Sequence, residues 1–208
     1  MAAPSPWPTI HAERSALADD LASLTEEQWS TPSLCGQWSV WETLGHMTAT
    51  AKMTRPRFLR KMAGTGFRFE PMFAKEIARE TAGTPTDTLA EFRAVMGAST
   101  GPPGPVDTWL GETIVHAEDI RRPLDIKHEY PQDALIRVAD FFKGSNLLIG
   151  TKTRISGLTL RAEDADWSTG SGPEVAGPML SLVLAMTGRP AGLVDLSGDG
   201  MATLTERV

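Results

Sequence analysis

The chain has 208 residues, a net charge of −6 and a single cysteine, Cys35. This length allows one or two compact domains with an apolar core, and the lone cysteine excludes an internal disulfide, as is usual in a reducing cytoplasm. The acidic balance argues against a nucleic-acid-binding surface, so the expected partner is a small molecule.

The N-terminus and the apolar segments bear on localisation. The opening residues, "MAAPSPWPTI", contain neither a basic region nor a long apolar run, so we expect no signal peptide. The longest apolar stretch, residues 179–186, is far shorter than the ~20 residues that a membrane-spanning helix needs. We therefore expect a cytoplasmic protein without a membrane partner.

Apolar periodicity predicts helices through the first half of the chain. The first covers residues 8–27, and a loop over 30–37 follows it because Pro32 and Gly36 interrupt the pattern. A second helix is predicted over residues 39–61. A third helical region covers 72–82 and continues in a segment that Thr86 can cap. A fourth helix is predicted over residues 106–122.

The start of the second helix carries a local signal. Ser39 and Glu42 have the spacing of a capping box, which predicts that Ser39 caps the helix. Pro56, further along, indicates a kink or a break.

Long helices joined by loops indicate a four-helix bundle over residues 1–128. The pattern then changes to a helix over 132–150, a strand and turn near Leu158, a helix from Val175 to Gly188, and a tail with a short strand. We therefore expect a mainly α protein, with a small α+β domain over residues 129–208.

The segment "GETIVHAEDIRRPL" holds the clearest chemical pattern. Glu112 and His116 lie four residues apart, so on a helix they are offset by about 40° and about 6 Å and can reach one cation. Carboxylate oxygen and imidazole nitrogen are common ligands of zinc and similar divalent metals. His46, among apolar residues of the second helix, is the best candidate for a third ligand from another helix.

Simpler interpretations stay open for each residue. A Glu–His pair at this spacing often arises by chance, and a lone histidine on an apolar face is more often a hydrogen-bonded core residue. Glu42 is a rival ligand, although the capping role is simpler. Cys35 could be a nucleophile or a soft ligand, but packing is its commoner role.

Two segments carry a resemblance to a known family. "LASLTEEQWSTPSLCGQWSVWETLGHM" resembles the opening of the mycothiol-dependent maleylpyruvate isomerase family, within the DinB/YfiT-like metal-binding superfamily, and "GETIVHAEDIRRPL" resembles its second block. The resemblance implies a DinB-like bundle whose metal ligands are His46, Glu112 and His116. It also implies a C-terminal domain that supplies an arginine near the metal, and Arg189 is the residue that matches it.

The resemblance further implies a function. A divalent metal, zinc by expectation, would bind mycothiol as a cosubstrate, and the protein would be a mycothiol S-transferase or a maleylpyruvate-type isomerase. The alternative is a non-catalytic protein that binds a metal or an apolar ligand. A link to DNA damage, which the superfamily name suggests, is disfavoured by the acidic charge. The expected state is a monomer or a homodimer.

Overall fold

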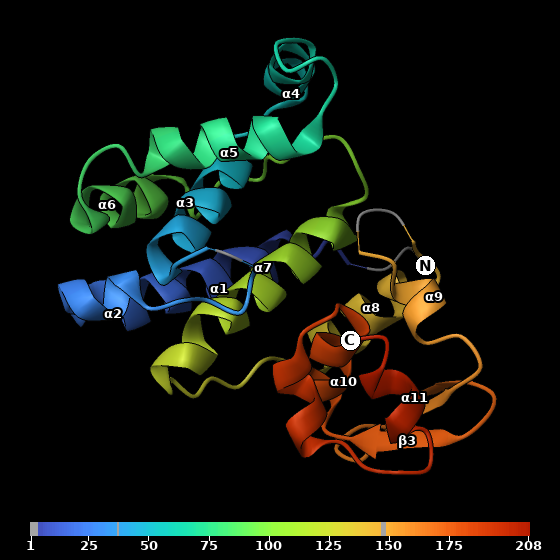
Figure 1. The fold of residues 1–208 in the computed structure, drawn as a ribbon. Coiled ribbons are helices and arrows are strands. Elements are labelled where there is room, and N and C mark those ends of the chain that lie inside the picture. The colour runs from blue at the N-terminus through green and yellow to red at the C-terminus, as the bar shows by residue number, and fades with distance from the viewer. Residues whose placement is uncertain (1–3, 37, 147–148) are drawn as a thin grey trace. The chain divides into compact units, whose positions relative to one another are not determined.

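A computed structural model describes residues 4–36, 38–146 and 149–208. Residue 37 of the predicted loop and residues 147 and 148 of the predicted helix over 132–150 lie outside the described residues. The chain divides into two compact units, Met1–His128 and Glu129–Val208, and each is described by itself (Figure 1). Within the described ranges, no helix combines the length and apolarity that crossing a membrane requires.

The first unit is helical, as predicted. Helix α3 packs against α5, α6 and α7, and α1 packs against α7, which produces the expected bundle (Figure 1). The helices are α1 (Trp7–Asp20), α2 (Glu26–Ser30), α3 (Val40–Ala51), α4 (Arg55–Ala63), α5 (Phe69–Glu80), α6 (Pro85–Val95) and α7 (Val106–Arg121), with 3₁₀ turns η1 (Leu21–Ser23) and η2 (Arg122–Leu124).

Capping residues divide two of the predicted helices. The helix predicted over 8–27 is interrupted: α1 ends at Asp20, the 3₁₀ turn η1 follows, and Thr25 begins a separate helix, α2, with a capping box to Gln28. The predicted helix over 39–61 ends at Ala51, and Thr54 caps α4, so Pro56 lies in a first helical turn, where proline is tolerated.

Two other capping predictions were tested by the structure. Ser39 caps α3 through the expected capping box with Glu42, whose carboxylate accepts a hydrogen bond from the Ser39 N–H at 2.9 Å. The prediction that Thr86 caps the next helix is wrong, since Thr84 caps α6 together with Asp87.

A hydrophobic core lies between α1, α3, α6 and α7. Gly45 allows α5 to approach α3 closely, because a Cβ at this position would come within 2.8 Å of the Thr81 methyl group. The buried residues of the core are Leu17, Ala18, Leu21, Trp29, Val40, Leu44, Met47, Leu89, Phe92, Ala117 and Ile120.

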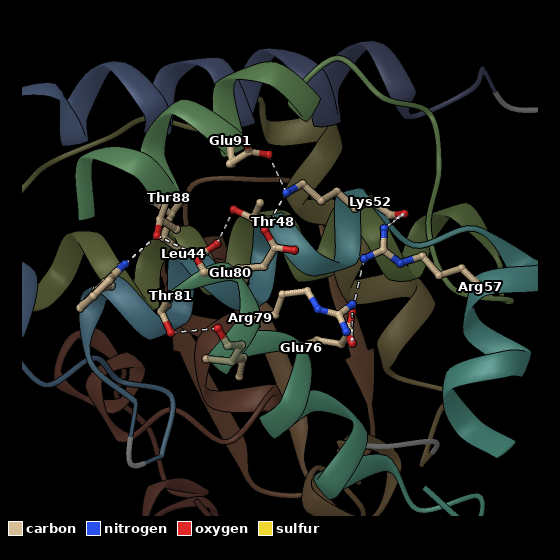
Figure 2. Close-up of polar contacts among 12 residues, drawn as sticks. Leu44, Thr48, Lys52, Arg57, Glu76, Arg79, Glu80, Thr81, Thr88 and Glu91 are labelled. Carbon is tan, nitrogen blue, oxygen red and sulfur yellow. Dashed lines mark hydrogen bonds and ion pairs between the residues drawn. The ribbon is translucent and has the colours of Figure 1, made fainter. Parts of the chain in front are cut away.

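Polar contacts tie α3 to α5 and α6 (Figure 2). The buried Thr88 hydroxyl accepts a hydrogen bond from Nε1 of Trp41 at 2.7 Å and donates one to the Glu80 carbonyl at 2.8 Å. Lys52, the C-cap residue of α3, pairs with Glu80 at 2.6 Å and with Glu91 at 2.8 Å. Thr88 therefore satisfies a side chain and a backbone group from two different helices.

We expect Thr88→Val to lower the free energy of unfolding by about 1–3 kcal/mol, because the variant loses both hydrogen bonds without changing shape. Urea unfolding of the purified protein measures the effect. Thr86→Val is the matched control, since Thr86 is exposed on the same helix. Equal stability of the two variants would contradict the role given to the Thr88 hydroxyl.

The second unit is a small α+β domain. Its elements are α8 (Gln132–Phe142), α9 (Thr151–Arg154), β1 (Thr159–Ala162), β2 (Ser168–Gly170), β3 (Glu174–Gly177), α10 (Met179–Met186), the 3₁₀ turn η3 (Pro190–Asp195) and α11 (Met201–Thr205). The strands form one sheet in the order β2-β1-β3, with β1 antiparallel to β2 and parallel to β3.

Three predictions for this unit need correction. Val175 does not begin a helix but pairs with Leu160 in the parallel ladder of β1 and β3. The tail contains α11 in place of the predicted short strand, and the helix predicted over 132–150 ends at Phe142. Strand pairing depends on contacts distant in sequence, which local periodicity does not report.

Candidate metal site

Two helices of the first unit bring together His46, Glu112 and His116. Each offers one ligand atom, and these atoms lie within 4.8 Å of one another. His46 comes from α3, while the other two lie one turn apart on α7, which packs against α3. The imidazole centroids of the two histidines are 4.9 Å apart, and Nε2 of His46 is 3.9 Å from Oε1 of Glu112.

The carboxylate of Asp119 contacts the ring of His116 and can orient it. Its carboxylate lies 2.8 Å from Nδ1 of His116, and the Asp119 side chain is fully buried. Because this contact occupies Nδ1, Nε2 is the ring nitrogen that would bind a cation. Metal-binding histidines commonly donate their second N–H to a carboxylate in this way.

The loop that carries Cys35 is anchored to the same helix. The Leu34 N–H donates to the Asp119 carbonyl at 3.0 Å, and the Cys35 N–H donates to the Ser33 hydroxyl at 3.1 Å. Cys35 thereby joins His116 and Asp119 in a second, overlapping group of possible metal ligands. Asp119 already contacts Nδ1 of His116. We therefore interpret Cys35 and Asp119 as residues that position His116, and His46, Glu112 and His116 as the metal ligands.

The buried polar atoms of the cluster fit a bound cation. Among the described residues, neither oxygen of Glu112 has a hydrogen-bond partner of normal geometry, although the hydroxyls of Thr50 and Thr113 are near. Nδ1 of His46 is likewise buried without a partner in the described part of the chain. A buried carboxylate without well-formed hydrogen bonds is costly, and a divalent metal would reduce that cost.

Burial and neighbouring charges shift the pKa values at the site. Burial lowers the pKa of His46 well below its usual value and raises the pKa of Glu112, although the nearby Arg14 guanidinium opposes the shift of Glu112. Burial by itself lowers the pKa of His116, but its contacts with Asp119 and Cys35 outweigh burial and raise it to about 10. A metal must therefore displace a proton from His116.

This shift predicts how the stability of the metal-free protein depends on pH. The pKa of His116 is about 10 in the folded protein and near 6.5 in the unfolded chain. Its contribution to the free energy of unfolding is therefore fully present below pH ~6.5 and is lost as the pH rises through ~10. Urea unfolding of chelator-treated protein across this range should show a decline that His116→Gln reduces. An equal decline in the variant would contradict the assignment.

Sequence comparison identifies the family. Residues 10–121, more than half of the chain, match the model described as the mycothiol maleylpyruvate isomerase N-terminal domain. The chain belongs to the mycothiol maleylpyruvate isomerase family. The match contains all three residues of the metal-ligand cluster, and it confirms the predicted family.

Structure comparison agrees with this membership. The mycothiol-dependent maleylpyruvate isomerase superposes with a TM-score of 0.63 at 15% identity, covering 93% of this chain and 91% of that one. A histidine-to-alanine mutant of that isomerase gives a TM-score of 0.64 at 16% identity, with the same coverage. A comparison with curated proteins found no match. The similarity confirms the expected fold, a mainly helical bundle followed by a small α+β domain.

Glu42, His128 and Arg189 lie outside the metal-ligand cluster of this family member. Glu42 completes the capping box of α3 with Ser39, and Nε2 of His128 pairs with Glu13 at 2.7 Å. Arg189 lies in the second unit, where its Nη1 donates to the Thr187 carbonyl at 2.8 Å. Its role near a metal stays a prediction from the family.

Sequence reasoning missed two residues of the site. Asp119 follows His116 by three positions on a helix, a spacing that places side chains on one face and could have indicated the contact. Arg14 on α1 is fully buried, and its Nε and Nη2 have no hydrogen-bond partner among the described residues. No local pattern links Arg14 to α7.

Proposed function

We propose that the protein is a metal-dependent enzyme that uses mycothiol, held as a thiolate, to attack a small electrophilic or unsaturated acid. The cluster of His46, Glu112 and His116 carries this proposal. Three protein ligands leave coordination positions open, which distinguishes catalytic from structural zinc sites. The contact between Asp119 and His116 supports it, because such carboxylates hold a metal-binding ring in position.

The chain's own residues would prepare the reaction. Zinc bound by these ligands would lower the pKa of the thiol and maintain it as a nucleophile. His46 and the α7 pair would hold the metal from two helices. The rings of Trp38 and Phe73 lie 4.9 Å and 5.2 Å from the His46 ring and would restrict the access of water.

Two reactions are consistent with such a thiolate. Addition of sulfur to a conjugated double bond moves an electron pair onto the carbonyl group. After rotation, the C–S bond breaks, the double bond re-forms and the thiol is recovered, which is cis–trans isomerisation. In S-transfer the same C–S bond forms, but a leaving group departs with its electron pair. Arg189 is proposed to bind a substrate carboxylate, on the basis of the family resemblance alone.

The consumption of thiol distinguishes these reactions. Zinc-loaded protein is incubated with mycothiol and either maleylpyruvate or monobromobimane, and product and free thiol are followed together. Isomerisation forms product at constant thiol, whereas S-transfer consumes one thiol for each electrophile. Absence of thiol-dependent turnover in protein that contains zinc would contradict the proposal and favour a non-catalytic binding protein.

A further inference from the structure

A series of aromatic rings leads from His46 to the protein surface. Phe73 lies edge-on to His46 at 5.2 Å, Phe69 stacks on Phe73 at 6.3 Å with an interplanar angle of 22°, and Phe58 lies 6.2 Å from Phe69. Phe73 is partly buried, but Phe69 is 43% exposed. The series thus connects the candidate metal site with solvent.

Local structure explains how the rings align. Phe69 and Phe73 are four residues apart on α5, so they share one face of the helix. The close approach of α5 to α3 at Gly45 brings this face to the neighbouring His46. The position of Phe73 beside a metal ligand therefore follows from the packing of the two helices.

Ion pairs hold α4 against α5. Glu76 on α5 is buried and pairs with Lys61 and with Arg57 at 3.5 Å, both from α4, and Figure 2 shows Arg57 reaching Glu76. Phe58 of α4 is thereby held beside Phe69. The outer end of the ring series is built on two helices joined by a buried ionic contact.

Large apolar side chains are exposed to solvent in α4 and at the start of α5. Of the large apolar side chains exposed in the described ranges, three lie in α4, in the loop after it and at the start of α5: Leu59 at 60%, Phe67 at 70% and Phe69 at 43%. Of these three side chains, only Phe69 belongs to the ring series that reaches His46 in the described part of the chain, so it alone extends exposed apolar surface toward the site.

We propose that Phe69 and Phe73 form the apolar side of the substrate site, and that the electrophile carries a flat conjugated or aromatic group which lies against them. A ring packed against the partly exposed Phe69 at the usual 4.5–7 Å would extend the series through which Phe73 reaches His46. This inference rests on the proposed function, because it assigns the substrate class of the same site.

Binding without turnover provides the first test. Equilibrium dialysis with 1,3-dinitrobenzene, a ring without a leaving group, requires neither metal nor thiol. We expect Phe69→Ala to raise the dissociation constant about threefold to tenfold, the effect of losing one aromatic contact. Phe67→Ala is the matched control because Phe67 is more exposed and belongs to no ring contact among the described residues. Equal weakening in both variants, or none in Phe69→Ala, would overturn the proposal.

Turnover provides the second test. With mycothiol and 1-chloro-2,4-dinitrobenzene, sulfur bonds to the ring carbon, chloride leaves with the electron pair, and the thiol proton passes to solvent. We expect Phe69→Ala, but not Phe67→Ala, to lower kcat/KM for this electrophile relative to iodoacetamide by about threefold to tenfold. An unchanged ratio would contradict the inference. If Phe69→Ala selectively weakens dinitrobenzene binding but no thiol transfer occurs, only the proposed function is refuted. If thiol transfer occurs but Phe69→Ala weakens dinitrobenzene binding no more than Phe67→Ala does, only this inference is refuted.

Discussion

Replacing His116 with alanine is expected to reduce the zinc content of the purified protein from about one ion per chain to near zero. The variant retains two of the three proposed ligands, His46 and Glu112. Loss of a direct ligand should weaken binding by more than about a hundredfold, the upper range for residues that only support a ligand. Thiol-dependent turnover should disappear with the metal.

Elemental analysis measures this outcome in protein purified without an affinity tag, so that added histidines bind no metal. His11→Ala is a suitable control, because His11 lies outside the cluster and contacts Trp7 and Ser99. Circular dichroism should show the same helix content in all three proteins. Zinc retained at wild-type levels in His116→Ala would refute the ligand assignment.

Replacing Glu112 with glutamine is expected to affect metal binding and stability in opposite directions. Zinc affinity should fall by more than about a hundredfold, since a neutral amide is a poor ligand compared with a carboxylate. The metal-free variant should nevertheless be more stable than metal-free wild type near pH 7. Burial raises the pKa of Glu112 despite the nearby Arg14, so the folded protein disfavours the charged form.

The sign of the stability change is informative in its own right. Neutralising a carboxylate that forms a structural ion pair would destabilise the protein. Neutralising a carboxylate that is buried as a metal ligand, at a cost to stability, would instead stabilise the metal-free protein. Competition with a chromophoric chelator measures affinity, and urea unfolding of chelator-treated protein measures stability. Glu26→Gln, a change at an exposed glutamate, should alter neither quantity. A less stable metal-free Glu112→Gln variant would exclude this explanation.

Sequence alone determined the features that depend on neighbouring residues. Periodicity predicted α7 almost to its ends, and the four-residue spacing placed Glu112 and His116 together on one face of it. The capping box of Ser39 with Glu42 located the start of α3, which carries His46. These signals are reliable because helix periodicity and capping act over one or two turns.

Other local signals were present but were not used. Thr25 and Gln28 also have capping-box spacing, and they divide the helix that was predicted over 8–27. The contact of His116 with Asp119 follows a three-residue spacing on α7. Both could have been predicted from the same rules that identified Ser39.

Only the tertiary structure decided which distant residues surround the cluster. Phe73 reaches His46 because Gly45 lets α5 approach α3, and Cys35 reaches His116 because its loop is bonded to the Asp119 backbone. The pairing of β1 with β3 is similarly long-range. Such contacts depend on how separate elements pack, and no pattern within a single segment specifies which segment will lie against it.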